Sequence, residues 1–211
     1  MPAEQTFLQS ENLITQIFRE KLGLFAQIHA GAIANPDGKG ILIIGPSGSG
    51  KTSITLASIL AGWSWLSDEY ALIPEDNPME VKGFPRNFNL KERSWKRFPD
   101  SGAGKSCIEL HSGFHKTMVR LFNPLEIRPE SHISKAELAA IILPIFSTEP
   151  TAPIQRRLEG IEALGKLLPE IQHAPAWLMD RINIWIHSLP IIEITYHDVG
   201  DLPPLLGSLQ L

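Results

Sequence analysis

The stretch GPSGSGKTS at residues 45–53 constrains the fold of this chain more than any other feature. It completes the pattern GxxxxGK[S/T], follows the apolar run ILII and precedes a segment that favours a helix. In such a phosphate-binding loop, backbone N–H groups wrap the phosphates, the lysine reaches the outer phosphates and the threonine hydroxyl can ligate magnesium. The positive end of the following helix points at the same anion. The predicted nucleotide contacts are Gly45, Ser47, Gly48, Ser49, Gly50, Lys51, Thr52 and Ser53.

A second stretch, SGAGKS at residues 101–106, resembles this loop without completing the pattern. Pro99 stands where the pattern requires glycine, and no apolar strand precedes it. We interpret the stretch as a flexible loop, with a second phosphate contact from Lys105 as the alternative.

The segment before the loop limits the class of fold. Only NPDGKG, residues 35–40, separates the apolar stretch GLFAQIHAGAIA from ILII. A parallel crossover needs a dozen or more residues, so this link predicts an antiparallel hairpin over residues 25–44. The fold class is therefore α/β, with a phosphate-binding loop in a mixed sheet and a hairpin feeding that loop. This arrangement disfavours ordinary small-molecule nucleotide kinases and GTPases.

The remaining chain divides into elements by hydrophobic period and turn residues. The stretch WSWLSDEYALI predicts a strand that is turned at residues 67–69, and Gly62 should end the helix that begins at Lys51. Residues 85–120 give no clear pattern. We expect an N-terminal helix in residues 1–24 and one nucleotide-binding catalytic domain over 25–211. Further helices are predicted over 4–21, 155–171 and 175–187, and further strands in MEVKGF, AELAAIILPIF and IIEITY.

Composition excludes several classes of protein. The chain has 211 residues, a net charge of −4 and one cysteine, Cys107, so it can form no internal disulfide and fits a reducing cytoplasm. The acidic balance argues against a nucleic-acid partner. The N-terminus lacks the pattern of a signal peptide, and the longest apolar run, residues 138–146, is too short to cross a membrane. We expect a soluble cytoplasmic protein.

An acidic pair, Asp68 and Glu69, follows the strand after the loop helix. Strand ends beside a phosphate loop are where ligands collect in α/β sheets. One carboxylate could hold magnesium while the other takes the proton of an attacking hydroxyl. The alternative is a polar turn with two solvated acids.

The stretch IHAGAIANPDGKGILIIGPSGSGKTSITLASILAGWSWLSDEYALI resembles the catalytic core of HPr kinase/phosphorylase. The same core fold is similar to ATP-dependent phosphoenolpyruvate carboxykinase. The resemblance implies an ATP- and magnesium-dependent kinase that acts on a serine of a protein or peptide. Because that family is often oligomeric, a homo-oligomer is a further expectation.

The resemblance also assigns roles to individual residues. Asp68 matches the catalytic aspartate that accepts the serine proton, and Glu69 stands where a second aspartate is usual. His29 would lie near Asp68 and orient it, with a packed strand histidine as the alternative. Arg86, in FPR, could contact the transferred phosphate or the substrate, with a solvated surface arginine as the alternative. Thr52, Asp68 and Glu69 are thus the predicted magnesium ligands.

The resemblance weakens beyond residue 92. LEIRP, residues 125–129, lacks the glycines of the family's second signature, in which Glu126 would be an acid beside the metal. The family's N-terminal domain has no counterpart here, which makes HPr itself a doubtful substrate. His111 and His115 are four residues apart, but the sequence between them favours no helix, which disfavours a structural metal. Two alternatives stay open: a non-catalytic ATP-binding sensor or scaffold, and a small-molecule kinase on the same fold.

Overall fold

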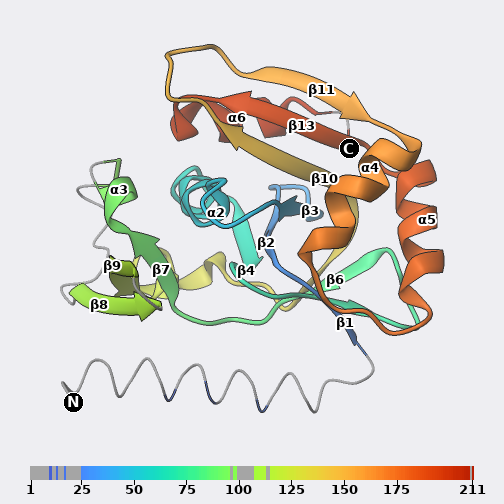
Figure 1. Cartoon of the computed structure of the whole chain (residues 1–211), viewed down its shortest axis with the longest axis horizontal. Coiled ribbons are helices and arrows are strands. Elements are labelled where there is room, and N and C mark those ends of the chain that lie inside the picture. Colours follow the sequence, from blue (N-terminus) through green and yellow to red (C-terminus); the bar gives the residue numbers. More distant parts are fainter. Residues whose placement is uncertain are drawn as a thin grey trace.

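Figure 1 shows the computed structural model of the chain. It describes residues 25–95, 97–98, 107–112, 115–209 and 211, together with positions 10, 13 and 17. The helix predicted over 4–21 and the glycine-rich stretch 101–106 lie largely or wholly outside these residues.

The described elements follow one another in a mixed α/β order. They are β1 (Phe25–Ile28), β2 (Ala30–Ala34), β3 (Lys39–Ile44), α2 (Lys51–Leu60), β4 (Ser64–Ser67), β5 (Ala71–Pro74), β6 (Glu80–Lys82), β7 (Phe88–Lys91), α3 (Glu92–Trp95), β8 (Cys107–Ser112), β9 (His115–Phe122), η1 (Pro124–Glu126), η2 (Pro129–Ser131), β10 (Lys135–Phe146), β11 (Ile154–Leu158), α4 (Gly160–Leu167), η3 (Leu168–Glu170), β12 (Ile171–His173), α5 (Leu178–Ser188), β13 (Ile191–Tyr196), η4 (Val199–Asp201) and α6 (Leu202–Gly207).

The predicted hairpin is present as β2 and β3, which pair antiparallel from Ala30 opposite Ile44 onward. Its turn is closed by the Asn35 carboxamide oxygen, which accepts from the backbone N–H groups of Asp37 and Lys39 at 3.1 and 2.8 Å. The prediction was wrong for residues 25–28, because β1 pairs with β5 and β12 instead. The chain changes partner at His29, whose N–H donates to the carbonyl of Glu170 at 2.8 Å.

The long strand β10 organises the main sheet, whose strand order is β12-β1-β5-β6-β10-β3-β2-β4. Its first residues pair antiparallel with β6, and its later residues pair parallel with β3 and with β13. The strand β13 also pairs with β11. The other strand pairs in this sheet are antiparallel, so the predicted mixed sheet with a hairpin-fed loop is confirmed.

Helices cover both faces of this sheet, and alternate residues of the central strands pack into the two hydrophobic cores, one on each face. Leu42 and Ile44 of β3 face a core that includes α4 and α5, while Ile41 and Ile43 face one that includes α2 and α6. Figure 1 shows α4 and α5 together at one side of the molecule, away from α2. Burying each such aliphatic side chain stabilises the fold by about 1.5–3 kcal/mol. The loop between β3 and α2 is therefore anchored at both of its ends.

The prediction of one helix over residues 155–171 was wrong. The chain there forms the edge strand β11, the short helix α4 and the strand β12. Gly160, the first residue of α4, has φ 53, so a glycine stands where the chain turns from β11 into the helix. Leu158 packs in the same core as Leu167, so the apolar spacing of a single helix is produced here by two different elements.

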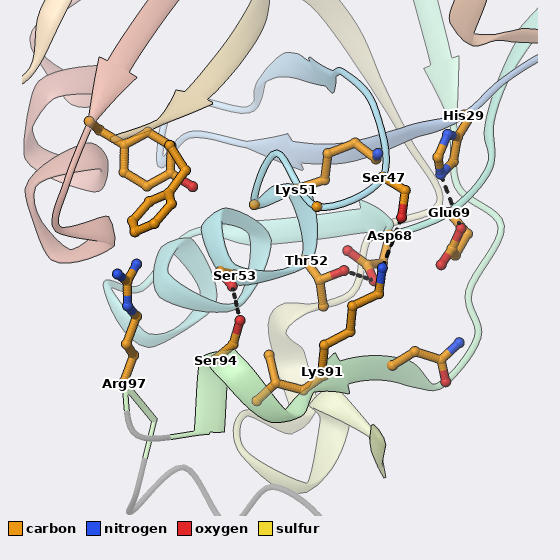
Figure 2. Close-up of a pocket in the computed structure, with 16 residues that line it drawn as sticks. His29, Ser47, Lys51, Thr52, Ser53, Asp68, Glu69, Lys91, Ser94 and Arg97 are labelled. Atoms are coloured by element: carbon orange, nitrogen blue, oxygen red, sulfur yellow. Dashed lines mark hydrogen bonds and ion pairs between the residues drawn. The ribbon is translucent and has the colours of Figure 1, made fainter. Parts of the chain in front are cut away.

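The segment without a clear pattern, residues 85–120, contains a second sheet with the order β7-β9-β8. Its strand β7 buries Phe88 and Leu90 in the same core as α2. This packing brings the end of β7 and the short helix α3 beside the N-terminal end of α2 (Figure 2). Among the described residues, no helix has the length and apolar character needed to cross a membrane.

Candidate active site

The loop at residues 45–50, which the sequence predicts to bind phosphate, joins β3 to α2, and a distant tyrosine fixes its last glycine. Gly50 has φ 106, in the left-handed region, and a Cβ at this position would overlap the Tyr196 hydroxyl. That hydroxyl donates to the carbonyl of Ser49 at 3.0 Å. Both the backbone conformation and the close approach of Tyr196 therefore require glycine at position 50.

From its place in the loop we expect the Lys51 side chain to face solvent when no nucleotide is bound. It is only 7% exposed, so this expectation is wrong. Its ammonium donates to the backbone carbonyls of Gly45 and Pro46 at 2.5 and 3.3 Å. A buried ammonium needs such acceptors, and the carbonyls of the loop supply them. Burial lowers the pKa of Lys51 from its ordinary value.

Asp68 lies in the turn between β4 and β5 and is 1% exposed. Its Oδ2 accepts from the Thr52 hydroxyl at 2.9 Å, which joins the loop helix to the acidic pair. Burial, and then the charge of Glu69, raise the pKa of Asp68 to about 7. Among the described residues, no hydrogen-bond donor reaches the buried Oδ1 of Asp68.

The neighbouring Glu69 forms a second cluster with His29 and Glu170. The His29 Nε2 lies 3.4 Å from a carboxylate oxygen of Glu69, and its Nδ1 lies 2.9 Å from one of Glu170. The hydrogen bond with Glu69 outweighs burial and raises the pKa of His29. Burial would raise the pKa of Glu69, but its hydrogen bond and charge interaction with His29 bring it below the usual value. We expected His29 to orient Asp68; its ring contacts the two glutamates instead.

Arg86 and Glu126 have different relations to the acidic pair. Arg86, before β7, is half-buried, and its positive charge contributes to lowering the pKa values of Asp68 and Glu69. Arg86 therefore partly opposes the rise in the pKa of Asp68 and adds to the fall in that of Glu69. Glu126 is exposed in the turn η1 and does not line the cavity at the loop.

Several residues of this site were missed by the sequence interpretation. Lys91, the last residue of β7, donates to the Ser47 hydroxyl of the loop at 2.8 Å. Ser94 of α3 lies 3.3 Å, oxygen to oxygen, from the hydroxyl of Ser53. Lys91 ends the stretch GFPRNFNLK, and its distance in sequence from the loop does not indicate a contact. The contact arises because β7 packs against α2.

These side chains surround a cavity of about 280 Å³ (Figure 2). The acidic pair and His29 lie at one side of it, and the two ammonium groups of Lys51 and Lys91 approach the loop. The lining residues are His29, Ser47, Gly48, Gly50, Lys51, Thr52, Ser53, Asp68, Glu69, Asn89, Leu90, Lys91, Ser94, Arg97, Phe146 and Tyr196.

The residues present fit a magnesium ion that is bound together with phosphates. Within the described part of the chain, no group of three or more His, Cys, Asp and Glu side chains could hold a metal ion. Mg²⁺, however, is usually held by one or two carboxylates, water and substrate phosphates. The Thr52 hydroxyl and the Asp68 carboxylate are already 2.9 Å apart, and Asp68 has a further oxygen without a donor among the described residues.

Comparisons with known proteins concern the fold. No protein-family model matches the chain. No curated protein matches it. Among solved structures, the chain is similar to the Hpr(Ser) kinase/phosphatase from Coxiella burnetii, with 15% identity and a TM-score of 0.42, over 87% of this chain and 92% of that one. The strand pairings themselves form the mixed sheet, with an antiparallel hairpin before the loop, that the sequence predicted.

Proposed function

We propose that the protein is an ATP-dependent kinase that transfers the γ-phosphoryl group to a hydroxyl, with a serine of a protein or peptide as the acceptor. The observation that carries this proposal is the bond from Thr52 to Asp68. It links a phosphate-binding loop directly to a buried carboxyl whose pKa is about 7. A group that changes protonation near neutral pH is suited to general base catalysis.

The loop and two lysines supply the phosphate site in this proposal. The backbone N–H groups of the loop and the start of α2 provide fixed donors and a partial positive charge. Lys51 exchanges its carbonyl acceptors for phosphate oxygens, and Lys91, held at Ser47, adds a second cation at the cavity. Thr52 and an acid of the pair would hold magnesium, which would supply charge neutralisation for the phosphates.

Asp68 acts as the base in this proposal. The acceptor oxygen attacks the γ-phosphorus, the hydroxyl proton passes to the Asp68 carboxylate, and the bridging oxygen leaves with ADP. Glu69 adds negative charge that raises the pKa of Asp68. Because His29 is hydrogen-bonded to Glu69, we assign His29 the role of holding Glu69 in place. We assign Arg86 the role of contacting the transferred phosphoryl group or the acceptor, because its charge acts on both acids.

A labelling experiment separates this proposal from its two alternatives. The protein is incubated with γ-labelled ATP and magnesium, first with an array of serine peptides and then with small hydroxyl compounds. Label on peptides supports the proposal, whereas label on small compounds alone indicates a small-molecule kinase. ATP binding without transfer or hydrolysis indicates a sensor or scaffold and contradicts the proposal.

The pH profile of the transfer tests the assigned base. With a pKa of about 7, the deprotonated fraction of Asp68 rises about tenfold between about pH 6 and about pH 8. The ratio kcat/KM, which reports groups of the free enzyme, should rise by the same factor. A profile that is flat over this range, with transfer intact, would assign the base elsewhere.

A further inference from the structure

An aromatic side chain is exposed at the margin of the cavity. Phe146 ends β10 and is 37% exposed, although the preceding residues 138 and 140–143 of the strand are largely buried. It lines the cavity together with Arg97, whose guanidinium carbon lies 4.5 Å from the centre of the Phe146 ring. One face of the Phe146 ring is thus covered by the flat guanidinium of Arg97, which comes from the turn after α3.

The place of this pair in the cavity indicates what it could bind. In Figure 2, Arg97 lies on the other side of Thr52 and Ser53 from Asp68 and Glu69. If the γ-phosphate is at Asp68, as the proposed function requires, the phosphate chain runs along the loop away from the acids. The nucleoside end of the chain then points toward Arg97 and Phe146.

The neighbours of Phe146 fix its ring and connect it to the loop. The His197 ring is stacked on it at 6.1 Å between centroids, and the Tyr196 ring meets it edge-on at 5.8 Å. Tyr196 is also the residue that holds the carbonyl of Ser49. The orientation of the Phe146 ring is therefore set by two rings, and one of them, Tyr196, also holds the phosphate loop.

We propose that Phe146 and Arg97 form a nucleobase subsite. The base of a nucleoside triphosphate stacks on the ring of Phe146, and the exposed guanidinium of Arg97 moves outward to cover the second face of the base. Aromatic rings and guanidinium planes both stack on bases, and such stacking does not depend on reading the hydrogen-bonding groups of the base. This inference rests on the proposed function in one respect, namely that the loop binds the phosphates of a nucleotide.

Calorimetry with ATP and with inorganic tripolyphosphate tests the subsite, because the second ligand has the phosphates but no base. The unmodified protein should bind ATP more tightly than tripolyphosphate. Phe146→Leu should reduce ATP affinity by about 5- to 140-fold, the range expected for one base–aromatic stack. Phe146→Trp should retain the affinity, and Arg97→Ala should reduce it. None of these variants should change tripolyphosphate affinity.

Ile145→Ala is the matched control, since Ile145 is the preceding residue of β10, is 41% exposed and does not line this cavity. It should bind both ligands as the unmodified protein does. Equal binding of ATP and tripolyphosphate by the unmodified protein would overturn the subsite alone. So would equal losses of both ligands in Phe146→Leu, or no loss of ATP. If the unmodified protein bound neither ligand, the phosphate-loop function would fail and the subsite with it.

Discussion

The buried carboxyl of Asp68 should destabilise the folded protein at neutral and alkaline pH, so Asp68→Asn should stabilise it there. Burial, followed by the charge of Glu69, raises the pKa of Asp68 from 3.8 to about 7. Between these values the folded protein keeps a proton that the unfolded chain releases. The free energy of unfolding therefore falls as the pH rises through this window, and the cost is complete above about pH 7.

The size of the effect follows from the width of the window. At about 1.4 kcal/mol per pKa unit, the raised pKa costs on the order of 4 kcal/mol at about pH 8, where Asp68 is ionised in both states. At about pH 5, where only the folded protein keeps the proton, the cost is on the order of 1.5 kcal/mol. Asparagine keeps the shape of the side chain and cannot ionise. The stability advantage of Asp68→Asn should thus be about 2.5 kcal/mol larger at about pH 8 than at about pH 5.

Urea unfolding measures this difference without any knowledge of the acceptor. The chain has five tryptophans, of which Trp63, Trp65 and Trp185 are buried, so their fluorescence should report unfolding. The comparison between two pH values cancels any constant loss from the changed bond to Thr52. Asp180→Asn, at an exposed position of α5, controls for the removal of one charge. An equal advantage of Asp68→Asn at both pH values would refute the reasoning.

Three further predictions concern ligands and the acidic cluster. Lys51→Ala should weaken ATP binding by about 10- to 150-fold in calorimetry, because it removes a hydrogen bond between charged groups. Unchanged affinity would contradict the phosphate-loop prediction. Asp68→Asn should retain ATP binding and lose about 10²–10⁴-fold in phosphoryl transfer, because asparagine cannot act as the base. If Glu69 is the acid of the pair that holds magnesium, added magnesium should partly restore Glu69→Gln. Rescue of the first variant and not the second would reverse the two roles. Glu170→Gln should lower the pKa of His29, measured by NMR of its ring, since the bond with Glu170 helps to raise that pKa; an unchanged titration would show that this carboxylate does not act on His29.

The parts of the fold that sequence predicts best are those fixed by neighbours in the chain. The hairpin depends on Asn35 and a glycine at residue 38, and the loop depends on glycines a few residues apart. Their patterns are therefore complete within short stretches. The acidic turn at Asp68 is similar, because the strand before it and the turn itself are both local signals.

The parts that sequence did not predict are made by contacts between distant segments. His29 and Glu170 are 141 positions apart in the chain. Lys91 and Ser47 are 44 positions apart. No local spacing in the sequence therefore indicates either contact. The acidic pair could be located from the sequence, but the contact of His29 with Glu170 could not. The helix predicted over 155–171 failed for a related reason, since Leu158 and Leu167 share a core through two separate elements.

The bond from Tyr196 to Ser49 has a consequence for the order in which the protein is made. The two bonded residues are 147 positions apart, and a side chain at position 50 would overlap the tyrosine hydroxyl. The loop is therefore synthesised well before β13, the strand whose tyrosine supports it. We therefore expect the nascent chain to acquire a complete phosphate site only after β13 has left the ribosome, so chains that still lack this strand should not compete for nucleotide.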